Sequence, residues 1–427
     1  MRFLVAAVVL LPQLAAAQAA SHALIDRLAA EASAEVVAWR RDIHQHPELS
    51  GEEARTSALV ARSLREMGIQ VRTGVGGGHG VVGILIGAQP GPVVALRADM
   101  DGLPVTEATS LPFRSTVRAQ FRGQEVGVMH ACGHDAHVAM LLGAARVLSR
   151  MQSSLRGAVV FIFQPSEETP PGGAAPMIAA GVLESPKVDA IFGLHVFPGD
   201  VGRIEYREGP LMASTDNWRV AFHGKQTHGA RPWDGVDPIV VGAQFVTAMQ
   251  TIVSRRADLT RTPSVITVGA FNAGLRENII PDSAVLIGTM RTFDRVVRTQ
   301  LQDELRRTAL GIASASGARA DVAFFPGYPV TVNDSALTRR MLPSLERVSP
   351  GKVALAKLSM PAEDFSYYQE KVPGMFVFLG VTPRGTSSAA APANHSPLFD
   401  VDESALPVGV RTLASLAVDF LGGGRGR

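Results

Sequence analysis

Several short apolar segments of this chain end at acidic or histidine side chains. Their β-branched and aromatic composition predicts buried strands, and helical patterns such as residues 135–151 separate them. This alternation predicts an α/β fold with a mostly parallel sheet. Because ligands gather beyond the carboxyl ends of parallel strands, the polar residues after the strands are expected to meet at one edge. These residues are Asp99, Asp101, Glu167, Glu168, His195 and His395.

A middle block departs from this alternation. Residues 212–325 read as strand, helix, two strands, helix and strand, which is the order of a ferredoxin-like α+β domain. We therefore expect an inserted lid domain over 212–325, which divides a catalytic domain into the segments 20–211 and 326–427. The length of 427 residues agrees with two or more domains.

The composition bounds the class of protein. With 46% hydrophobic and 19% charged residues, the chain has the make-up of a folded protein and not of a disordered one. The formal net charge is +2, and no Lys/Arg-rich run is present in the sequence. No nucleic-acid partner is therefore expected.

The first 19 residues have the pattern of a secretory signal peptide. Arg2 gives a positive start, an apolar run over 3–11 follows, and Ala15 and Ala17 stand in an A-x-A arrangement. We expect cleavage after Ala17 or Ala19 and export to the periplasm or the medium; a buried N-terminal helix or an uncleaved anchor is the alternative. No later stretch is expected to span a membrane, so the mature protein should be soluble.

The segment "HACGHDAHVAM" holds three of the 11 histidines and the only cysteine. A single thiol cannot form an intrachain disulfide, and in an oxidising compartment it should be buried or protected by a metal. Cys132 and His134 lie two apart on a loop that enters a helix, so both can face one ion. With Glu168, His195 and His395 they offer five ligands of mixed softness, enough for two metal ions that share a bridging group.

The adjacent residues Glu167 and Glu168 cannot both face a metal in the same way on an extended loop. One can ligate while the other acts as a general base, which takes a proton from water and gives it to the leaving amine. Asp101 fits a supporting role, in which it fixes a ligand imidazole or the base. The alternatives are a solvated turn for the two glutamates and structural roles for the single histidines.

Seven motifs carry a resemblance to a known family. The chain resembles the zinc-dependent amidohydrolases that include hippurate hydrolase and the plant indole-acetyl amino acid hydrolases, within the aminoacylase and glutamate carboxypeptidase superfamily. The match runs in consistent order from Val36 to the C-terminus, and it implies the same architecture of a catalytic α/β domain with an inserted lid. The motifs are "LRADMDGLPVTE", "HACGHDAHVAMLLGAA", "FQPSEE", "FGLHV", "ENIIPD", "MPAEDFS" and "NHSPLF".

The resemblance assigns roles to the residues at the strand ends. It implies Glu167 as the general base and Asp101 as its catalytic helper. A histidine of the wider superfamily is replaced by Asp99, and His137 is expected to support the neighbouring ligand His134. Two divalent ions are expected, Zn or Mn, with Co or Ni as further options. The implied metal ligands are Cys132, His134, Glu168, His195 and His395.

The resemblance extends to the lid. His228, in "GKQTHGARP", matches a histidine that reaches the active site of a neighbouring subunit and stabilises the oxyanion, so a homodimer or higher oligomer through the lid is expected. Asn278 and Arg291 match positions that hold the substrate's carboxylate, and the forked guanidinium of arginine suits that group. Plain surface roles for His228 and Arg291 are the alternative.

The combined expectation is an enzyme that hydrolyses the amide bond of N-acyl amino acids and releases a carboxylic acid and an amino acid. A metallo-carboxypeptidase or dipeptidase that acts on short peptides with the same site is one alternative. A Cys132 thiol hydrolase is a second, which alkylation rather than chelation would inhibit. A third is an exported metal-binding protein without catalysis, in which the carboxylates of Glu167 and Asp101 would not be expected.

Overall fold

The computed structural model describes residues 4–423, with side chains from Gln18 onward. The chain forms two compact units. The first unit comprises Met1–Gly209, Val332–Lys357 and Tyr367–Arg427, and the second comprises Pro210–Thr331 and Leu358–Ser366. The segment Leu358–Ser366 was expected in the catalytic domain, but it groups with the second unit. Backbone hydrogen bonds from Ala213 to Ser359 and from Ser359 to Leu211 hold it there.

A mixed eight-stranded sheet forms the centre of the first unit, and its middle is parallel as predicted. β3 pairs in parallel with β6 and β7, and β7 pairs in parallel with β18. Antiparallel pairs join β1 to β2 and β2 to β6, and β8 runs antiparallel to β18. The strands in spatial order are β1 (Gln70–Val75), β2 (Gly80–Ile86), β6 (Arg156–Gln164), β3 (Gln89–Asp99), β7 (Ala190–Phe197), β18 (Gly374–Gly380), β8 (Ile204–Tyr206) and β17 (Val353–Leu355).

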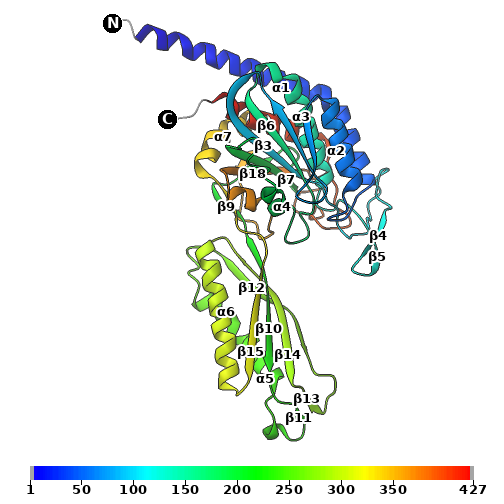
Figure 1. Ribbon diagram of the computed structural model, residues 1–427, viewed down its shortest axis with the longest axis vertical. Helices are drawn as coiled ribbons and strands as arrows, with labels where there is room; N and C mark the ends of the chain where they lie inside the picture. The colour runs from blue at the N-terminus through cyan, green and yellow to red at the C-terminus, as the bar shows by residue number, and fades with distance from the viewer. Residues whose placement is uncertain (1–3, 424–427) are drawn as a thin grey trace. The chain divides into compact units, whose positions relative to one another are not determined.

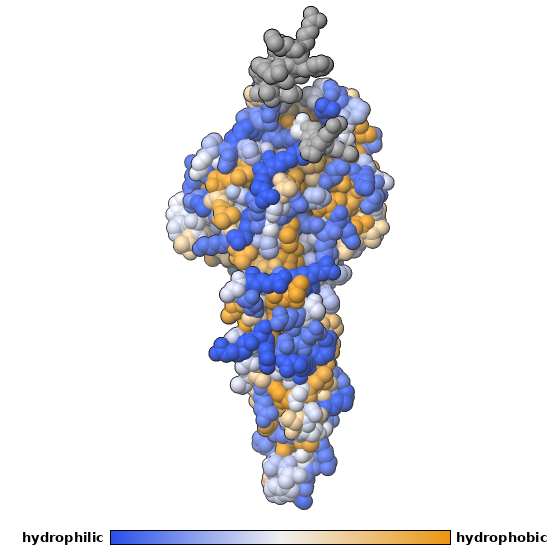
Figure 2. Space-filling model, turned by 90° about the vertical axis from the view of Figure 1, so that its left-hand side faces the viewer, coloured by the Kyte–Doolittle hydropathy of each residue, from blue (hydrophilic) through white to orange (hydrophobic). Residues whose placement is uncertain are grey.

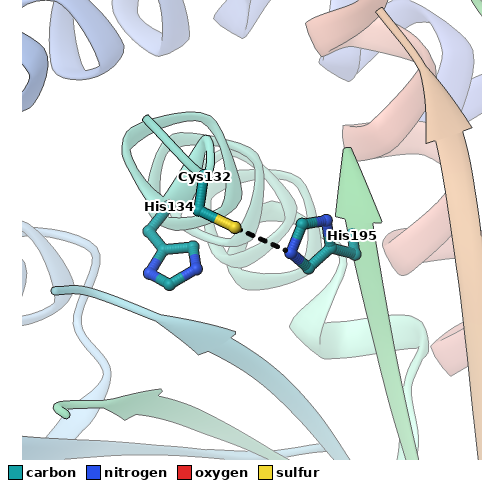
Figure 3. A group of neighbouring side chains, drawn as sticks. All are labelled: Cys132, His134 and His195. Carbon is teal, nitrogen blue, oxygen red and sulfur yellow. Dashed lines mark hydrogen bonds between the residues drawn. The ribbon is translucent and has the colours of Figure 1, made fainter. Parts of the chain in front are cut away.

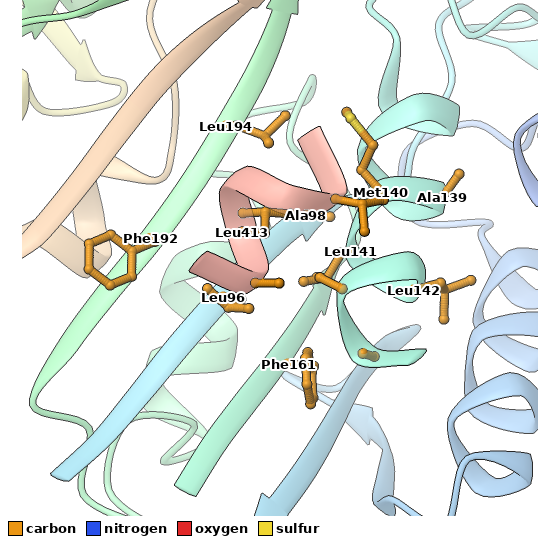
Figure 4. Close-up of a cluster of buried hydrophobic side chains, with 14 of the residues drawn as sticks. Leu96, Ala98, Ala139, Met140, Leu141, Leu142, Phe161, Phe192, Leu194 and Leu413 are labelled. Carbon is orange, nitrogen blue, oxygen red and sulfur yellow. The ribbon is translucent and has the colours of Figure 1, made fainter. Parts of the chain in front are cut away.

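Helices cover this sheet and enclose the main core. α3 and α9 pack against each other and against α1, α7 packs on α9, and α2 packs against β1 and β2 (Figure 1). In Figure 4, side chains from α3, α9 and three strands meet, among them Leu141, Leu413, Leu96, Phe161 and Phe192. These helices are α1 (Leu4–Gln45), α2 (Ala54–Glu66), α3 (His134–Arg150), α7 (Ser335–Val348) and α9 (Leu406–Gly422).

Shorter elements complete the chain. β4 and β5 form a hairpin, and β9 pairs with β16. Their bounds are β4 (Arg118–Phe121), β5 (Gln124–Gly127), α4 (Ala174–Ala179), β9 (Gly209–Met212), β16 (Thr331–Asn333) and α8 (Ser366–Gln369).

One late helix contradicts the expectation that no stretch after the N-terminus is long and apolar enough to span a membrane. Glu403–Gly422 passes that test by length and composition, although 67% of its most apolar window is buried inside the protein. Leu413 and Leu416 are fully or almost fully buried. The segment is apolar because α9 packs between other helices and the sheet, as the core helix of a globular protein does.

The predicted signal peptide is described only in part. Residues 1–3 are not described, and side chains are described only from Gln18. From Leu4 to Gln45 the backbone is one helix, α1. Ile25, Leu28 and Val36 of this helix are buried in the core, so the part of α1 after the expected cleavage sites is an integral part of the fold.

The second unit has the predicted order of strands and helices. A four-stranded antiparallel sheet, β12-β14-β10-β15, packs against α5 and α6. Trp218, Phe222, Phe245 and Leu305 are buried in its core. Figure 2 shows hydrophobic and hydrophilic residues mixed on the surface of this unit. The elements are β10 (Ser214–His223), β11 (Thr227–His228), α5 (Pro238–Arg255), β12 (Ser264–Ala273), β13 (Ile279–Ile280), β14 (Ser283–Thr292), α6 (Arg295–Ala315) and β15 (Arg319–Pro326).

The packing of α3 against α1 and α9 can be tested at Gly143. A Cβ at this position would lie 2.6 Å from a Val410 methyl group and 2.7 Å from a Val36 methyl group. Gly143→Ala is therefore expected to lower the free energy of unfolding by about 1–3 kcal/mol. Gly311→Ala in α6, where nothing lies within 4 Å, should instead stabilise the protein by about 0.5–1 kcal/mol. Urea denaturation followed by circular dichroism measures both; a stabilised Gly143→Ala protein would contradict the packing.

Candidate metal centre

Cys132 and His134 lie at the start of α3, beside the end of β7. The turn between them needs Gly133, which has a φ of 87°; a Cβ there would lie 2.3 Å from a Val196 methyl group. The Cys132 Sγ atom is 3.4 Å from Nε2 of His195. Figure 3 shows the sulfur pointing toward the His195 ring, with His134 on the same turn as Cys132. Two chain segments thus bring a thiol and two imidazoles together.

His195 is held in the tautomer that a metal ligand requires. Its Nδ1 lies 2.8 Å from the carbonyl oxygen of Val196, which can only accept, so Nδ1 carries the proton and donates. Nε2 therefore presents its lone pair toward Cys132. Burial lowers the pKa of His195 well below its ordinary value, so the ring is neutral and able to bind a cation.

Glu168 and His395 complete a second group of ligand atoms around the same sulfur. His395 Nε2 lies 3.2 Å from Glu168 Oε1, and His134 Nε2 lies 3.9 Å from the same oxygen. Cys132, His134 and His195 offer ligand atoms that all lie within 4.8 Å of one another, and so do Cys132, Glu168 and His395. The five ligand residues named from the sequence therefore converge, and Cys132 belongs to both groups.

This donor set fits divalent ions. Among the described residues, the buried Nε2 atom of His134 has no hydrogen-bond partner, an arrangement that is unfavourable without a cation. Burial, followed by the charges of Glu168 and Glu167, raises the pKa of the Cys132 thiol well above its ordinary value. A bound cation would reverse this shift and deprotonate the thiol. The same surroundings disfavour Cys132 as a nucleophile in the absence of a metal.

Asp101 anchors the turn that carries the two glutamates. Its carboxylate accepts hydrogen bonds from the backbone N–H groups of Glu167 and Glu168, both at 3.0 Å, and from the Ser50 hydroxyl at 2.6 Å. It also lies 3.3 Å from Nδ1 of His134. One buried carboxylate thus fixes both glutamates relative to α3, which is a more specific arrangement than the sequence indicated.

Asp99 and His137 form a hydrogen-bonded pair next to His134. His137 Nε2 accepts the backbone N–H of Val196 at 2.9 Å, so Nδ1 carries the proton and donates it to Asp99 at 2.6 Å. Both ring nitrogens are thus engaged, which agrees with a supporting role for His137. Arg97 donates to the other oxygen of Asp99 at 2.5 Å, and that oxygen lies 3.8 Å from Nε2 of His134.

Asn394 is a residue of the site that the sequence reasoning missed. Its side-chain amide donates to the carbonyl oxygens of Cys132 and Val196, both at 3.1 Å. The next residue, His395, has a φ of 70°, and its N–H donates to Ala131 at 2.8 Å. Asn394 therefore joins three ligand-bearing segments. The only signal was its position directly before the histidine in "NHSPLF".

Glu53 is a second such residue. It is fully buried and accepts hydrogen bonds from the N–H groups of Gly51 at 2.9 Å and Ser166 at 2.8 Å. Ser166 has a φ of 58° and directly precedes the two glutamates. Burial, followed by the charge of Asp101, raises the pKa of Glu53 to about 7. Its place in the run "HPELSGEE" gave no chemical reason to select it.

The second unit brings together two of its three candidate residues. His228 on β11 pairs with Ile279 of β13, and the N–H of the adjacent Gly229 donates to the carbonyl oxygen of Asn278 at 2.8 Å. His228 Nδ1 accepts the N–H of Ala230 at 3.0 Å, so its Nε2 carries a proton and is a donor. The His228 side chain is exposed.

Arg291 lies apart from this pair. It stands near the far end of β14, where it pairs with Thr215 and Val265, whereas β11 and β13 lie beyond the start of that strand (Figure 1). Eight residues separate Arg291 from Ser283, which is roughly 26 Å along a strand. Within one chain, Asn278 and Arg291 therefore cannot hold the same carboxylate.

The α/β unit with its metal-ligand cluster and the inserted α+β unit define a metal-dependent amidohydrolase. The chain belongs to Peptidase family M20/M25/M40, whose model matches residues 95–419. It is 42% identical over 390 residues to thermostable carboxypeptidase 2 of Saccharolobus solfataricus, covering 90% of this chain and 95% of the relative. It is 40% identical over 396 residues to IAA-amino acid hydrolase ILR1-like 4 of Arabidopsis thaliana, covering 90% and 86%. The resemblance stated from the motifs is thus confirmed.

A solved structure agrees with the fold and with the number of metal ions. A dinuclear metal-binding peptidase of the M20 family from Bacillus subtilis matches with a TM-score of 0.78 and 38% identity, over 91% of this chain and 98% of that one. Together with the two overlapping ligand groups, it supports a site for two divalent ions.

The role of Asn394 as a support of the ligands can be tested by removing its amide. Asn394→Ala is expected to weaken the binding of Mn²⁺ or Zn²⁺ by about 10- to 100-fold, as is typical when a group that orients metal ligands is lost. Isothermal titration calorimetry on the metal-stripped protein measures this. The exposed Ser387→Ala variant, in the same loop, is the control. An unchanged affinity of the Asn394→Ala protein would contradict the role.

A buried ionic network lies beside the centre, around the residue that follows His134. His44 Nδ1 is 2.8 Å from Asp135, its Nε2 is 3.2 Å from Glu107, and Arg40 donates to Asp135 at 2.9 Å. Burial opposes the charged form of His44, but Asp135 and then Glu107 outweigh it and raise the pKa of His44 to about 9. His44 is thus part of a structural ion network.

This shift predicts a loss of stability at high pH. The folded-state pKa of His44 lies above the unfolded value of about 6.5. The stabilisation of the folded state by protonated His44 is therefore fully present below pH 6.5 and is lost as the pH rises through 9. Up to about 3 kcal/mol of unfolding free energy should disappear between pH 7 and pH 10. In His44→Gln this pH dependence should be weaker, as measured by urea denaturation at each pH. If the unfolding free energies of the wild-type and His44→Gln proteins change with pH in parallel, the prediction is wrong.

Proposed function

We propose that this protein hydrolyses the amide bond of N-acyl amino acids and releases a carboxylic acid and an amino acid. In this proposal Cys132, His134, Glu168, His195 and His395 hold two divalent ions, Zn or Mn, with Co or Ni as further options. The observation that carries the proposal is the pair of ligand groups that share the Cys132 sulfur and lie beside the Glu167 carboxylate.

The bound ions would supply Lewis acidity to the amide carbonyl and to the attacking water. Glu167 takes a proton from that water and later delivers it to the leaving nitrogen. Asp101 keeps Glu167 in place through the backbone hydrogen bond at 3.0 Å. Because Asp101 also holds Glu168, the base and a metal ligand keep a fixed spacing during the reaction.

The residues of the second unit bind the other parts of the substrate in this proposal. His228 donates a hydrogen bond from its Nε2–H group to the developing oxyanion, and Asn278 and Arg291 hold the carboxylate of the amino acid. Because Arg291 stands roughly 26 Å along β14 from Ser283 and Asn278 lies beyond that end of the strand, a complete site takes the two residues from two copies. We therefore propose a dimer through the second unit, in which the exposed edge strand β12 and the exposed Val265 and Ile287 offer a surface for pairing.

A peptidase activity is the second candidate. The relative from Saccharolobus solfataricus is named a carboxypeptidase, and a peptide bond next to a free carboxylate presents the same groups as an N-acyl amino acid. A parallel assay of N-acyl amino acids and of peptides with the same terminal residue separates the two activities.

We also propose that the protein is exported after removal of residues 1–19 and acts in the periplasm or the medium. The charged start, the apolar run and the A-x-A arrangement support this proposal. Determination of the N-terminal sequence of the protein from a cell fraction tests it. A protein that retains Met1 and remains in the cytoplasm would overturn it.

Metal removal and replacement test the reaction itself. EDTA is expected to abolish cleavage of N-acyl amino acids, and Zn²⁺, Mn²⁺, Co²⁺ or Ni²⁺ added back singly should restore it with at least one ion. The readout is release of free amino acid. If the wild-type protein cleaves no amide with any of the four ions, the proposed function is wrong. Inhibition by a thiol alkylator but not by EDTA would favour the Cys132 thiol mechanism.

Glu167→Gln separates an enzyme from a metal-binding protein. The amide keeps the size of the side chain but cannot accept the proton, so kcat should fall by a factor of about 10² to 10⁴, while two ions per chain remain bound. Metal content by atomic emission and turnover are measured on the same sample. Gln250→Ala, on an exposed site of α5, serves as the control. Full turnover by Glu167→Gln would contradict the assignment of the base.

A further inference from the structure

A cavity of about 310 Å³ in the first unit has the metal ligand Glu168 in its wall. Its walls also include the apolar residues Leu49, Leu103, Pro104 and Phe121, and the charged residues Glu52 and Arg122. A second cavity, of about 350 Å³, lies near Pro198 and Phe399 and includes none of the five ligand residues in its lining. The first cavity therefore borders the metal centre and can receive a group attached to the scissile carbonyl.

Two lining residues of this cavity, Ser50 and Leu103, are connected by hydrogen bonds to segments of the metal centre. Ser50, in the wall, donates to Asp101 at 2.6 Å. Leu103 and Met129 exchange two backbone hydrogen bonds, at 2.9 and 3.0 Å, and Met129 is three residues before Cys132. A group seated here is consequently held at a fixed place relative to the proposed ligands.

The size and lining of the cavity select its occupant. An engineered cavity of about 150 Å³ holds a benzene molecule, so about 310 Å³ accommodates an aromatic ring with a substituent. Leu49, Leu103 and Phe121 provide apolar contacts for such a ring, since ligand pockets are lined mainly by apolar groups with a few polar ones.

Arg122 supplies the polar group. It occupies the tip of the β4–β5 hairpin, where it and Gly123 have φ values of 51° and 78°, as in a type I′ turn. Such a turn favours Asn-Gly, and an arginine in this conformation costs about 1 kcal/mol. The guanidinium lies 5.2 Å from the centre of the Phe121 ring, and within residues 4–423 it forms no ion pair. The conformation of the turn therefore does not explain why an arginine stands at position 122.

We propose that this cavity binds the acyl group of the substrate, and that the preferred acyl group is an aromatic ring with a carboxylate at its far end, paired with Arg122. The ring contacts Leu103 and Phe121, and Glu52 at the same cavity limits the affinity because its charge repels that carboxylate. This inference rests on the proposed amide hydrolysis and specifies its substrate class.

The test compares N-benzoyl-L-alanine with N-(4-carboxybenzoyl)-L-alanine as substrates of the metal-loaded protein. The wild-type protein should favour the carboxylated substrate about tenfold in kcat/KM, mainly through KM. Arg122→Ala should abolish this preference, and Glu52→Gln should increase it. Arg118→Ala, on the same hairpin but paired with Glu125, is the matched control and should keep it. A preference that is absent in the wild-type protein, or unchanged in Arg122→Ala, overturns the proposal.

A binding experiment separates failure of this inference from failure of the proposed function. Terephthalate, the acid that the carboxylated substrate would release, should bind to the wild-type protein about tenfold more tightly than to Arg122→Ala in isothermal titration calorimetry. If no amide is cleaved but this difference is found, the cavity is supported and the proposed function fails. If amides are cleaved but terephthalate binds equally to both proteins, the proposed function stands and the cavity inference fails.

Discussion

The carboxylate of Asp101 organises the metal centre. It is the common acceptor for two successive backbone N–H groups of the turn at Glu167 and Glu168, and it faces His134 at the start of α3. Without this anchor, two adjacent carboxylates would repel each other and turn toward water. With it, they are held at a fixed distance from His134 at the start of α3 and from Cys132 in the turn before it. The roles proposed for the two glutamates therefore depend on a residue that is itself not assigned as a ligand.

Much of the fold could be predicted from the sequence because its strongest signals are local. The buried strands β6 and β18 are nearly continuous apolar runs, and the second unit repeats the order of a ferredoxin-like domain. The segment Leu358–Ser366 was misplaced because backbone hydrogen bonds at Ser359 hold it, and such bonds leave no side-chain signature. α9 satisfied a membrane-span criterion because a helix buried on most sides is as apolar as one in lipid.

Some residues of the candidate site could be predicted from the sequence, and others could not. The ends of buried strands predicted Glu168 and His195 as neighbours, and the spacing of two residues from His134 on a loop that enters a helix predicted Cys132. Asn394 and Glu53 could not be found in this way, because they act on backbone carbonyl and N–H groups whose positions only the folded chain defines. The separation of Arg291 from Asn278 likewise depends on strand register, which the motifs do not contain.

The order of the ligands along the chain has a consequence for biosynthesis. His395 is contributed by one of the last loops of the polypeptide, and its N–H is tied to Ala131, beside the first ligand of the chain. The entire second unit is made between these two points. A nascent chain therefore cannot form the complete centre until its C-terminal segment has been synthesised and has packed onto the early part. Binding that requires all five proposed ligands therefore comes after this last packing step.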